Sequence, residues 1–457
     1  MNDREERSRL SGRVGRYARV GAGLGGAAAG VAARRLVGAV AGGDASALNQ
    51  RDAEALKSAL GGLKGPLMKA AQIMATVPDL LPPEFAEELG SLQSAAPPMG
   101  PGFVRRRMAA ELGPAWKGEF REFEQEAAAA ASLGQVHRAT HKDGRALACK
   151  LQYPDMRSAI DADIDQLKLA LSIFKRIEPS IDTSAVQEEL TERLREELDY
   201  KREAAHMRLY RSILGDTGTV HVPEPIEALS TGRLLTMTWI SGDKLLAFKG
   251  RSQEERNTIA VNLFHAWWRP FTRHAVIHGD PHLGNYTVRP DDLSINLLDY
   301  GCVRVFDAKF ATGVVDLYRA IRADDRDAIV AAYEVWGFKG LSNDLIETLS
   351  VWAKFIYGPI LDDRTRTVAD GIAPAEYGRR EAFEVRERLK KYGPVTIPRE
   401  FVLMDRAAIG LGSVFLHLDA ELNFHRLFEA EIEGVEETAL RERQARALAD
   451  AEVPIAA

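Results

Sequence analysis

Two short motifs, HGDPHLGN (278–285) and LLDYG (297–301), contain the residues with the clearest chemistry. An aspartate, an asparagine five residues later, and a second aspartate before an aromatic residue and a glycine are typical of a phosphoryl-transfer site. Such a reaction needs a carboxylate that orients the attacking oxygen, and Asp280 suits that role. It also needs oxygen ligands for Mg²⁺ bound to the phosphates, which Asn285 and Asp299 can supply.

The first motif permits a second interpretation, in which His278 and His282 bind a metal ion. No third soft ligand lies near them in the sequence, so this interpretation is disfavoured. Each motif alone could also be a polar turn between buried strands. The presence of both, in the order that phosphoryl transfer requires, argues against simple turns.

A lysine, Lys150, lies in the apolar run ALACKLQ (146–152), whose alternation predicts a buried strand. A buried lysine is costly unless an anion pairs with it. Before this run, the segment AAAASLGQVH (128–137) stands where a kinase has its glycine-rich phosphate loop. Alanine replaces the first two glycines of that pattern, which predicts a stiffer loop; the alternative is an alanine-rich turn before a strand. The predicted nucleotide-binding residues are Ala129, Ala130, Ala131, Ser132, Gly134, Val136 and Lys150.

The acidic segment EELDYKREAAH (196–206) offers carboxylates that could pair with the lysine, namely Glu196, Glu197, Asp199 and Glu203. On a continuous helix Asp199 and Glu203 share a face, whereas Glu197 points away from Asp199. One lysine therefore does not engage the whole cluster, and two basic partners are implied. The alternative is an acidic helix face that only contacts solvent.

The elements expected around these residues form an α+β, bilobal protein-kinase-like fold with a helical N-terminal extension and a mostly helical C-terminal lobe. Apolar residues recur at helical spacing between 52 and 77, and short apolar runs between 120 and 235 predict strands with inserted helices. After residue 301 the pattern becomes helical within about eight residues and no Ala-Pro-Glu motif follows, so a platform for protein substrates is not expected. The expected domains are 1–50, a basic leader; 51–115, the extension; 116–240, the N-lobe; and 241–457, the C-lobe.

Composition fits a folded protein in a reducing compartment. The 457 residues are 46% hydrophobic and 28% charged, with a net charge of −6 that does not favour nucleic acid. Two cysteines cannot form a disulfide framework, and no run of eighteen uninterrupted apolar residues occurs. The first forty residues hold eight arginines against three acidic residues, around a Gly/Ala-rich stretch. This pattern indicates either binding to a membrane surface or a loosely ordered leader.

Taken together, the motifs resemble those of the UbiB/ADCK (AarF) family of atypical protein-kinase-like ATPases. The resemblance runs from about residue 55 to 430 and rests on KAAQ (69–72), LPPEFAEELGSLQ (81–93), AAASLGQVH, CKLQYP, ELDYKREA, HGDPHLGN and LDYG. It implies that Lys150 pairs with Glu203. It also implies that Lys69 and Gln72 lie in the active site near Glu197 and Asp199. Ala71 replaces the family's glycine before Gln72.

The resemblance implies that the chain binds ATP with Mg²⁺ and hydrolyses it, or transfers phosphate to a non-protein acceptor. It links the chain to isoprenoid-quinone (ubiquinone) biosynthesis, so the expected partners are a membrane lipid or quinone intermediate, quinone-biosynthesis proteins and a second copy of the chain, without nucleic acid. The expected location is cytoplasmic and peripheral to the inner membrane, because the sequence ends without the paired C-terminal membrane helices of some members. The alternatives are an aminoglycoside- or choline-kinase-type phosphotransferase, which also uses an HGD loop, and a nucleotide-gated lipid-binding scaffold.

Overall fold

The computed structural model describes residues 99–453, apart from residues 132, 155, 157–159, 162–163, 166–167, 169–190, 193–194, 216, 373–377, 394 and 396–397. These residues belong to two compact units. The smaller unit contains 99–104, 127–136 and 152–198, and the larger contains 105–126, 137–151 and 199–453. The predicted leader and most of the helical extension lie outside the described residues, and the predicted domain bounds stay a prediction.

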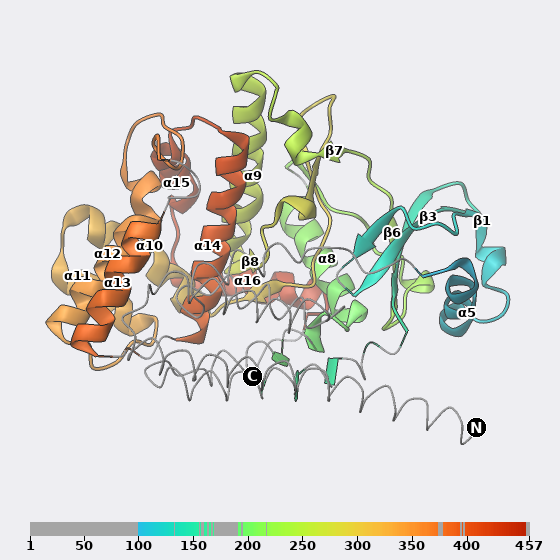
Figure 1. Cartoon of the computed structure of the whole chain (residues 1–457), viewed down its shortest axis with the longest axis horizontal. Coiled ribbons are helices and arrows are strands. Elements are labelled where there is room, and N and C mark those ends of the chain that lie inside the picture. Colours follow the sequence, from blue (N-terminus) through green and yellow to red (C-terminus); the bar gives the residue numbers. More distant parts are fainter. Residues whose placement is uncertain are drawn as a thin grey trace, which may run out of the picture. The chain divides into compact units, whose positions relative to one another are not determined.

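The apolar run that contains Lys150 is itself a strand of a five-stranded sheet, with a neighbouring strand on each side. One sheet has the order β1 (Phe120–Phe123), β3 (Gly134–His141), β4 (Ala146–Gln152) and β6 (Leu234–Thr238), and β2 (Ala129–Ala131) pairs with β3. Every residue of β4 after Ala146 is buried, as the apolar run predicts. Antiparallel pairing of β4 with β6 places Lys150 opposite Leu235 in the sheet. Strands β1, β3 and β6 of this sheet are labelled in Figure 1.

Helix α8 (Tyr200–Leu214) packs against β6 and carries the buried Glu203 in its first turn. It begins at Asp199, whose carboxylate accepts hydrogen bonds from the backbone amides of Lys201 and Arg202. An aspartate at this position satisfies amides that have no partner within the helix. The expectation of one continuous helical face through Asp199 and Glu203 is therefore wrong, because the helix starts only after Asp199.

Two smaller sheets carry the motifs at 278–285 and 297–301. The first has the order β5 (Val220–His221), β10 (Ile295–Leu297), β9 (Tyr286–Val288) and β7 (Asp243–Lys244). The second pairs β8 (Val276–His278) with β11 (Val303–Val305) in an antiparallel arrangement. Both motifs therefore lie in turns at strand ends, where neighbouring strands fix the backbone on each side.

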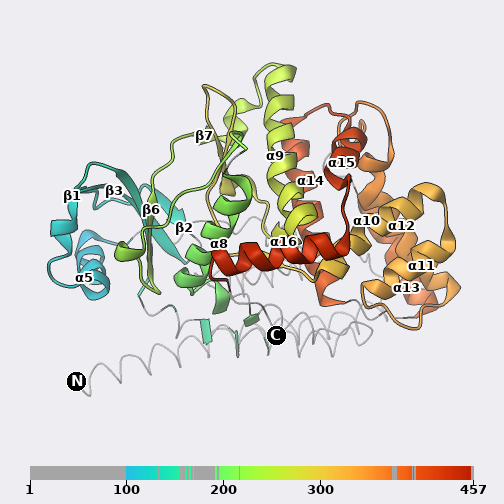
Figure 2. The same ribbon diagram turned by 180° about the vertical axis from the view of Figure 1, so that it is seen from behind.

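Helices make up most of the chain after residue 252, as predicted. Helix α9 (Gln253–His274) starts with a capping box between Ser252 and Glu255, and its buried face is rich in aromatic rings. Trp268 on this face contacts Phe428 edge-on, with ring centroids 4.7 Å apart. The other helices in this region are α10 (Ala308–Ala323), α11 (Arg326–Val335), α12 (Asn343–Leu361), α13 (Arg379–Tyr392), α14 (Arg399–Leu418), α15 (Phe424–Ile432) and α16 (Glu437–Asp450). The last of these packs against α8, α9 and α10 (Figure 2).

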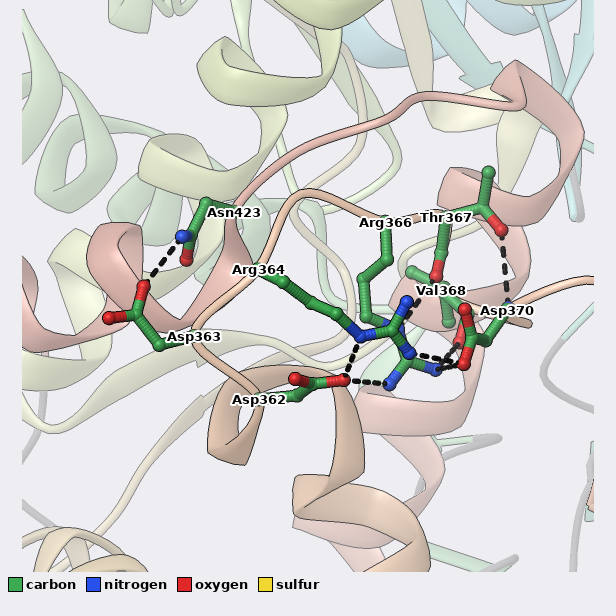
Figure 3. Close-up of polar contacts among 8 residues, drawn as sticks. All are labelled: Asp362, Asp363, Arg364, Arg366, Thr367, Val368, Asp370 and Asn423. Carbon is green, nitrogen blue, oxygen red and sulfur yellow. Dashed lines mark hydrogen bonds and ion pairs between the residues drawn. The ribbon is translucent and has the colours of Figure 1, made fainter.

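The segment after α12 contains a network of ion pairs and hydrogen bonds (Figure 3), beside the buried apolar side chains of Val368 and Ala369. Arg364 and Arg366 both contact Asp362, at 2.7 and 3.0 Å, and both also pair with Asp370. Asn423 donates to the neighbouring Asp363 at 2.7 Å, which joins this segment to the start of α15. Each arginine contacts more than one acceptor, so the network adds directional polar contacts to this connection.

Among the described helices, α14 alone has the length and apolar composition of a membrane span. It packs against α9 and α12, and 44% of its most apolar window is buried. A core helix of a folded domain can have the same length and apolar composition, and α14 packs against other helices as a core helix does.

Candidate active site

A buried ion pair joins β4 to α8. Lys150 Nζ lies 2.6 Å from Glu203 Oε1, and these side chains are only 8% and 3% exposed. Burial alone would lower the pKa of Lys150, but attraction to Asp299 and Glu203 raises it well above its ordinary value. The lysine is therefore a permanent cation at physiological pH. In the acidic segment 196–206, its partner is Glu203.

Asp299 of the LLDYG motif approaches the same lysine. Its Oδ2 lies 3.3 Å from Lys150 Nζ, and its Oδ1 accepts a hydrogen bond from the amide of Gly301 at 2.9 Å. About a third of this side chain is exposed, unlike that of Glu203. Two carboxylates thus lie within ion-pair distance of one ammonium group.

Two histidines hold the backbone of the same motif. His278 Nε2 makes a short hydrogen bond to the carbonyl oxygen of Asp299, and His206 Nδ1 lies 3.1 Å from that of Tyr300. Because a carbonyl only accepts, both ring nitrogens must carry protons. Burial, and next the nearby Arg202, lowers the pKa of His206 to about 3, so its ring is neutral. Helix α8 therefore contacts Lys150 through Glu203 and the LLDYG motif through His206.

The catalytic loop leaves β8 at a point of close backbone approach. The amide of Gly279 donates to the carbonyl oxygen of Cys302 at 3.1 Å. A Cβ atom at Gly279 would lie only 2.4 Å from that oxygen, so only glycine fits here. Asp280 follows directly, and Asn285 Nδ2 donates to its carbonyl oxygen at 2.8 Å. This bond closes the loop between the two polar residues.

Asn285 and Asp299, the predicted magnesium ligands, lie on neighbouring segments of the chain. The carbonyl oxygen of Asn285 accepts the amide of Leu298 at 3.0 Å, one residue beyond the β9–β10 ladder, so these two chain segments lie side by side. The bond from Asn285 Nδ2 to the loop turns the amide so that Oδ1 is the atom left for a ligand. Magnesium needs few protein oxygens when nucleotide phosphates complete its shell. These residues therefore fit the ion.

The alternative metal pair gains no support from the geometry. His278 is occupied with the carbonyl of Asp299, and the exposed His282 accepts the amide of Gly284 at 3.1 Å. The part of the chain that the structure describes contains no group of three histidine, cysteine or acidic side chains that could hold a metal.

The alanine-rich segment forms a tight hairpin within the smaller unit. Ala129 pairs with Val136 and Ala131 with Gly134, while the turn contains the buried Leu133. Ala129 and Ala130 are exposed, and their role in binding phosphates stays a prediction. Of the predicted binding residues here, Ser132 lies outside the described residues.

The remaining predicted residues are placed only in part. The Asp199 carboxylate caps α8, and Glu197 is half-buried in the turn before it, within the smaller unit. Lys69 and Gln72 lie outside the described residues, so their expected contact with Glu197 and Asp199 stays a prediction.

Two polar residues at the site were missed by the sequence analysis, His206 and Arg406. Arg406 of α14 places Nη2 3.2 Å from Asp280 Oδ1. The partners of His206 and Arg406 are 94 and 126 positions away in the sequence, so no local pattern reveals the contacts. The one available signal for His206 is its spacing of three from Glu203, on the same helical face.

Comparison with known proteins agrees with this geometry. The model of the ABC1 atypical kinase-like domain matches residues 91–333. The chain is 32% identical over 275 residues to AarF domain-containing protein kinase 1 of Xenopus laevis, covering 58% of this chain and 52% of the relative. It is 28% identical over 320 residues to atypical kinase coq-8, mitochondrial, of Caenorhabditis elegans, covering 69% and 42%. The chain thus spans about half the length of these curated relatives.

A solved structure shows the same fold. The complex of Rv3197 with erythromycin from Mycobacterium tuberculosis matches with a TM-score of 0.57 and 27% identity, over 85% of this chain and 97% of that one. The family model covers more than half of the sequence and includes the lysine, the catalytic loop and the LLDYG motif. The chain therefore belongs to the ABC1 atypical kinase-like family, which is the UbiB/ADCK (AarF) family that its motifs resemble.

Proposed function

We propose that the chain binds Mg-ATP and hydrolyses it or transfers its γ-phosphoryl group to a lipid or other small molecule. The observation that carries the proposal is the pair of Lys150 and Glu203 at 2.6 Å with Asp299 at 3.3 Å from the same ammonium. A protein kinase needs this lysine–glutamate pair and this aspartate in place for transfer.

Each residue has a distinct task in this proposal. Lys150 neutralises negative charge on the nucleotide phosphates, and Glu203 fixes its position. Asn285 and Asp299 would hold Mg²⁺, which when bound neutralises charge that develops on the phosphates. Asp280 orients the attacking oxygen, so that its new bond to phosphorus forms opposite the bond to the departing ADP.

We further propose that this activity supports isoprenoid-quinone biosynthesis at a membrane, with a lipid or quinone intermediate as its ligand. The resemblance to the UbiB/ADCK family supports this role, and the relatives include atypical kinases named COQ8, mitochondrial. A non-protein acceptor is favoured because α10 begins at Ala308, soon after Gly301, and leaves little chain for a substrate platform. Some relatives are named protein kinases, so a protein acceptor is a necessary arm of any test.

The test is Mg²⁺-dependent phosphate release from ATP, measured with and without vesicles of phosphatidylglycerol or phosphatidylcholine. Asp299→Asn should abolish release, whereas Asp291→Asn, at an exposed position in the preceding turn, should not change it. Stimulation by the anionic vesicles alone would support a membrane ligand. Release that persists in Asp299→Asn would refute the assigned site. Transfer of labelled phosphate to a general protein substrate, at a rate above hydrolysis, would refute the non-protein acceptor.

A second candidate ligand is a lipophilic small molecule other than a quinone. The solved relative was obtained in complex with erythromycin, a macrolide. Adding erythromycin to the same assay tests this candidate directly, because an acceptor or allosteric ligand changes the rate of phosphate release. No change at saturating erythromycin would refute it.

A further inference from the structure

The guanidinium of Arg406 lies against the catalytic loop but uses only part of its hydrogen-bonding capacity. Its Nη2 pairs with Asp280 Oδ1 at 3.2 Å, and the arginine side chain is 11% exposed. Its Nη1 is buried and has no hydrogen-bond partner within the part of the chain that the structure describes. Buried donors, and charged ones above all, are rarely left without a partner. A ligand that approaches Asp280 would meet this donor.

A second contact fixes the position of Arg406. Gly410, one helical turn later in α14, lies so close to the catalytic loop that a Cβ atom there would be 2.9 Å from Pro281 Cγ. Residues four apart share a helix face, so α14 meets the loop through both Arg406 and Gly410. The helix is itself held by packing against α9 and α12. The guanidinium is thus mounted on a rigid element rather than on a loop.

In phosphoryl transfer, an oxygen of the transferred group is a suitable acceptor for Arg406 Nη1. The transferred group carries negative charge on three equatorial oxygens, and the attacking oxygen approaches beside the loop aspartate. Other phosphoryl-transfer enzymes stabilise this charge with an arginine supplied within the chain or by a partner. A planar guanidinium can bond a carboxylate with one nitrogen and a phosphoryl oxygen with another.

We propose that Arg406 is a catalytic residue of this chain, which holds Asp280 through Nη2 and offers Nη1 to an oxygen of the transferred phosphoryl group. The inference rests on the proposed function. In the step, the attacking oxygen of water or an acceptor hydroxyl bonds to the γ-phosphorus while the bond to the bridging oxygen breaks. ADP leaves with that electron pair, and the attacking oxygen's proton passes to Asp280 or to the phosphate formed. Arg406 stabilises the charge and exchanges no proton.

Three proteins test this role: the wild type, Arg406→Lys and Arg406→Met. Lysine keeps the charge beside Asp280 but lacks the second planar donor, so kcat should fall about 10²- to 10³-fold in Arg406→Lys. The Kd for Mg-ADP and the melting temperature should change little in this variant. Arg326→Lys is the matched control, because Arg326 forms an exposed ion pair with Glu347 far along the sequence from the catalytic loop, and it should keep wild-type kinetics.

Binding of Mg-ADP with aluminium fluoride, which mimics the transferred group, separates this inference from the proposed function. We expect aluminium fluoride to tighten Mg-ADP binding to the wild type, and to tighten it much less in Arg406→Lys and Arg406→Met. That loss would support the inference even if the wild type released no phosphate and the hydrolysis proposal failed. Wild-type kcat and aluminium fluoride binding in Arg406→Lys would overturn it, because charge alone would then suffice. A loss of Mg-ADP affinity together with a lower melting temperature would also overturn it, in favour of a structural role.

Discussion

The buried pair of Lys150 and Glu203 permits a quantitative test of the site through a double-mutant cycle. The variants are Lys150→Met, Glu203→Gln and the double substitution, all of which keep side-chain volume nearly constant. Lys150→Met removes the counter-charge of two carboxylates, Glu203 and Asp299. Glu203→Gln leaves the ammonium with Asp299 and still provides an acceptor oxygen.

The expected magnitudes follow from burial. Removing one partner of a buried pair costs about 3–5 kcal/mol of folding free energy, which we expect for Lys150→Met because Glu203 is only 3% exposed. Glu203→Gln should cost less, about 2 kcal/mol, since Asp299 remains beside the lysine. In the double variant neither charge is left buried without its partner, so its cost should not exceed that of Lys150→Met. The coupling energy is then at least about 2 kcal/mol.

Urea unfolding at pH 7.5, followed by tryptophan fluorescence, measures each free energy. The control cycle uses the exposed pair of Arg326 and Glu347, whose side chains are 52% and 57% exposed. Exposed pairs couple by less than about 1 kcal/mol. If the two cycles gave equal coupling, the inference that burial makes the Lys150–Glu203 pair strong would be wrong. If Lys150→Met folded and kept its affinity for Mg-ATP, the assignment of the lysine to nucleotide binding would be wrong.

Three further predictions concern Gly279 and His206 at the site, and Asp405 of α14, which accepts a hydrogen bond from Trp352 Nε1 at 2.7 Å. Gly279→Ala should lower kcat at least about 10-fold, because the new Cβ would lie 2.4 Å from the carbonyl oxygen of Cys302 and displace the loop. The control, Gly250→Ala, adds a Cβ in open space and should not change kcat. Equal kcat values for the two variants would contradict this prediction. His206→Phe should cost about 1–3 kcal/mol at pH 7.5, since the carbonyl of the DYG tyrosine loses its donor. Because burial lowers the pKa of His206 to about 3, the wild type should lose stability as the pH falls below about 6.5. His206→Phe should lose less stability over the same pH range, which urea unfolding of both proteins above and below pH 6.5 measures. Burial raises the pKa of Asp405 to about 7, so the unfolded chain ionises first and stability falls as pH rises from about 4 to 7. Asp405→Asn should therefore stabilise the protein at pH 8, by at most about 4 kcal/mol, but not at pH 4; no difference at pH 8 would refute the assignment.

The sequence analysis correctly predicted features that depend on residues close together in the sequence. The alternation around Lys150 identified a buried strand, and the turn after LLDYG was predicted to lead quickly into a helix, which begins at Ala308. Spacing also limited the partners of the lysine to a short acidic segment. It failed at Asp199, because helical periodicity was applied through a residue type that commonly begins a helix.

The residues that spacing could not identify act across the fold. His206 and Arg406 each sit in an ordinary helix, and nothing in their neighbours distinguishes them from surface residues. Their roles come from the packing of α8 and α14 against loops encoded about a hundred positions away. Such contacts depend on tertiary structure, and a single sequence contains no periodic trace of them.

The supports of the site also bear on how its residues are held in place. In protein kinases, phosphorylation of a loop controls whether the lysine–glutamate pair and the aspartate motif are in place. Here the pair is formed at 2.6 Å, and two histidines fix the carbonyl oxygens of Asp299 and Tyr300. Helix α10 begins soon afterwards at Ala308 and occupies the chain that a switchable loop would use. A site assembled in this way is suited to turnover that is limited by the arrival of its ligand rather than by ordering of its own backbone.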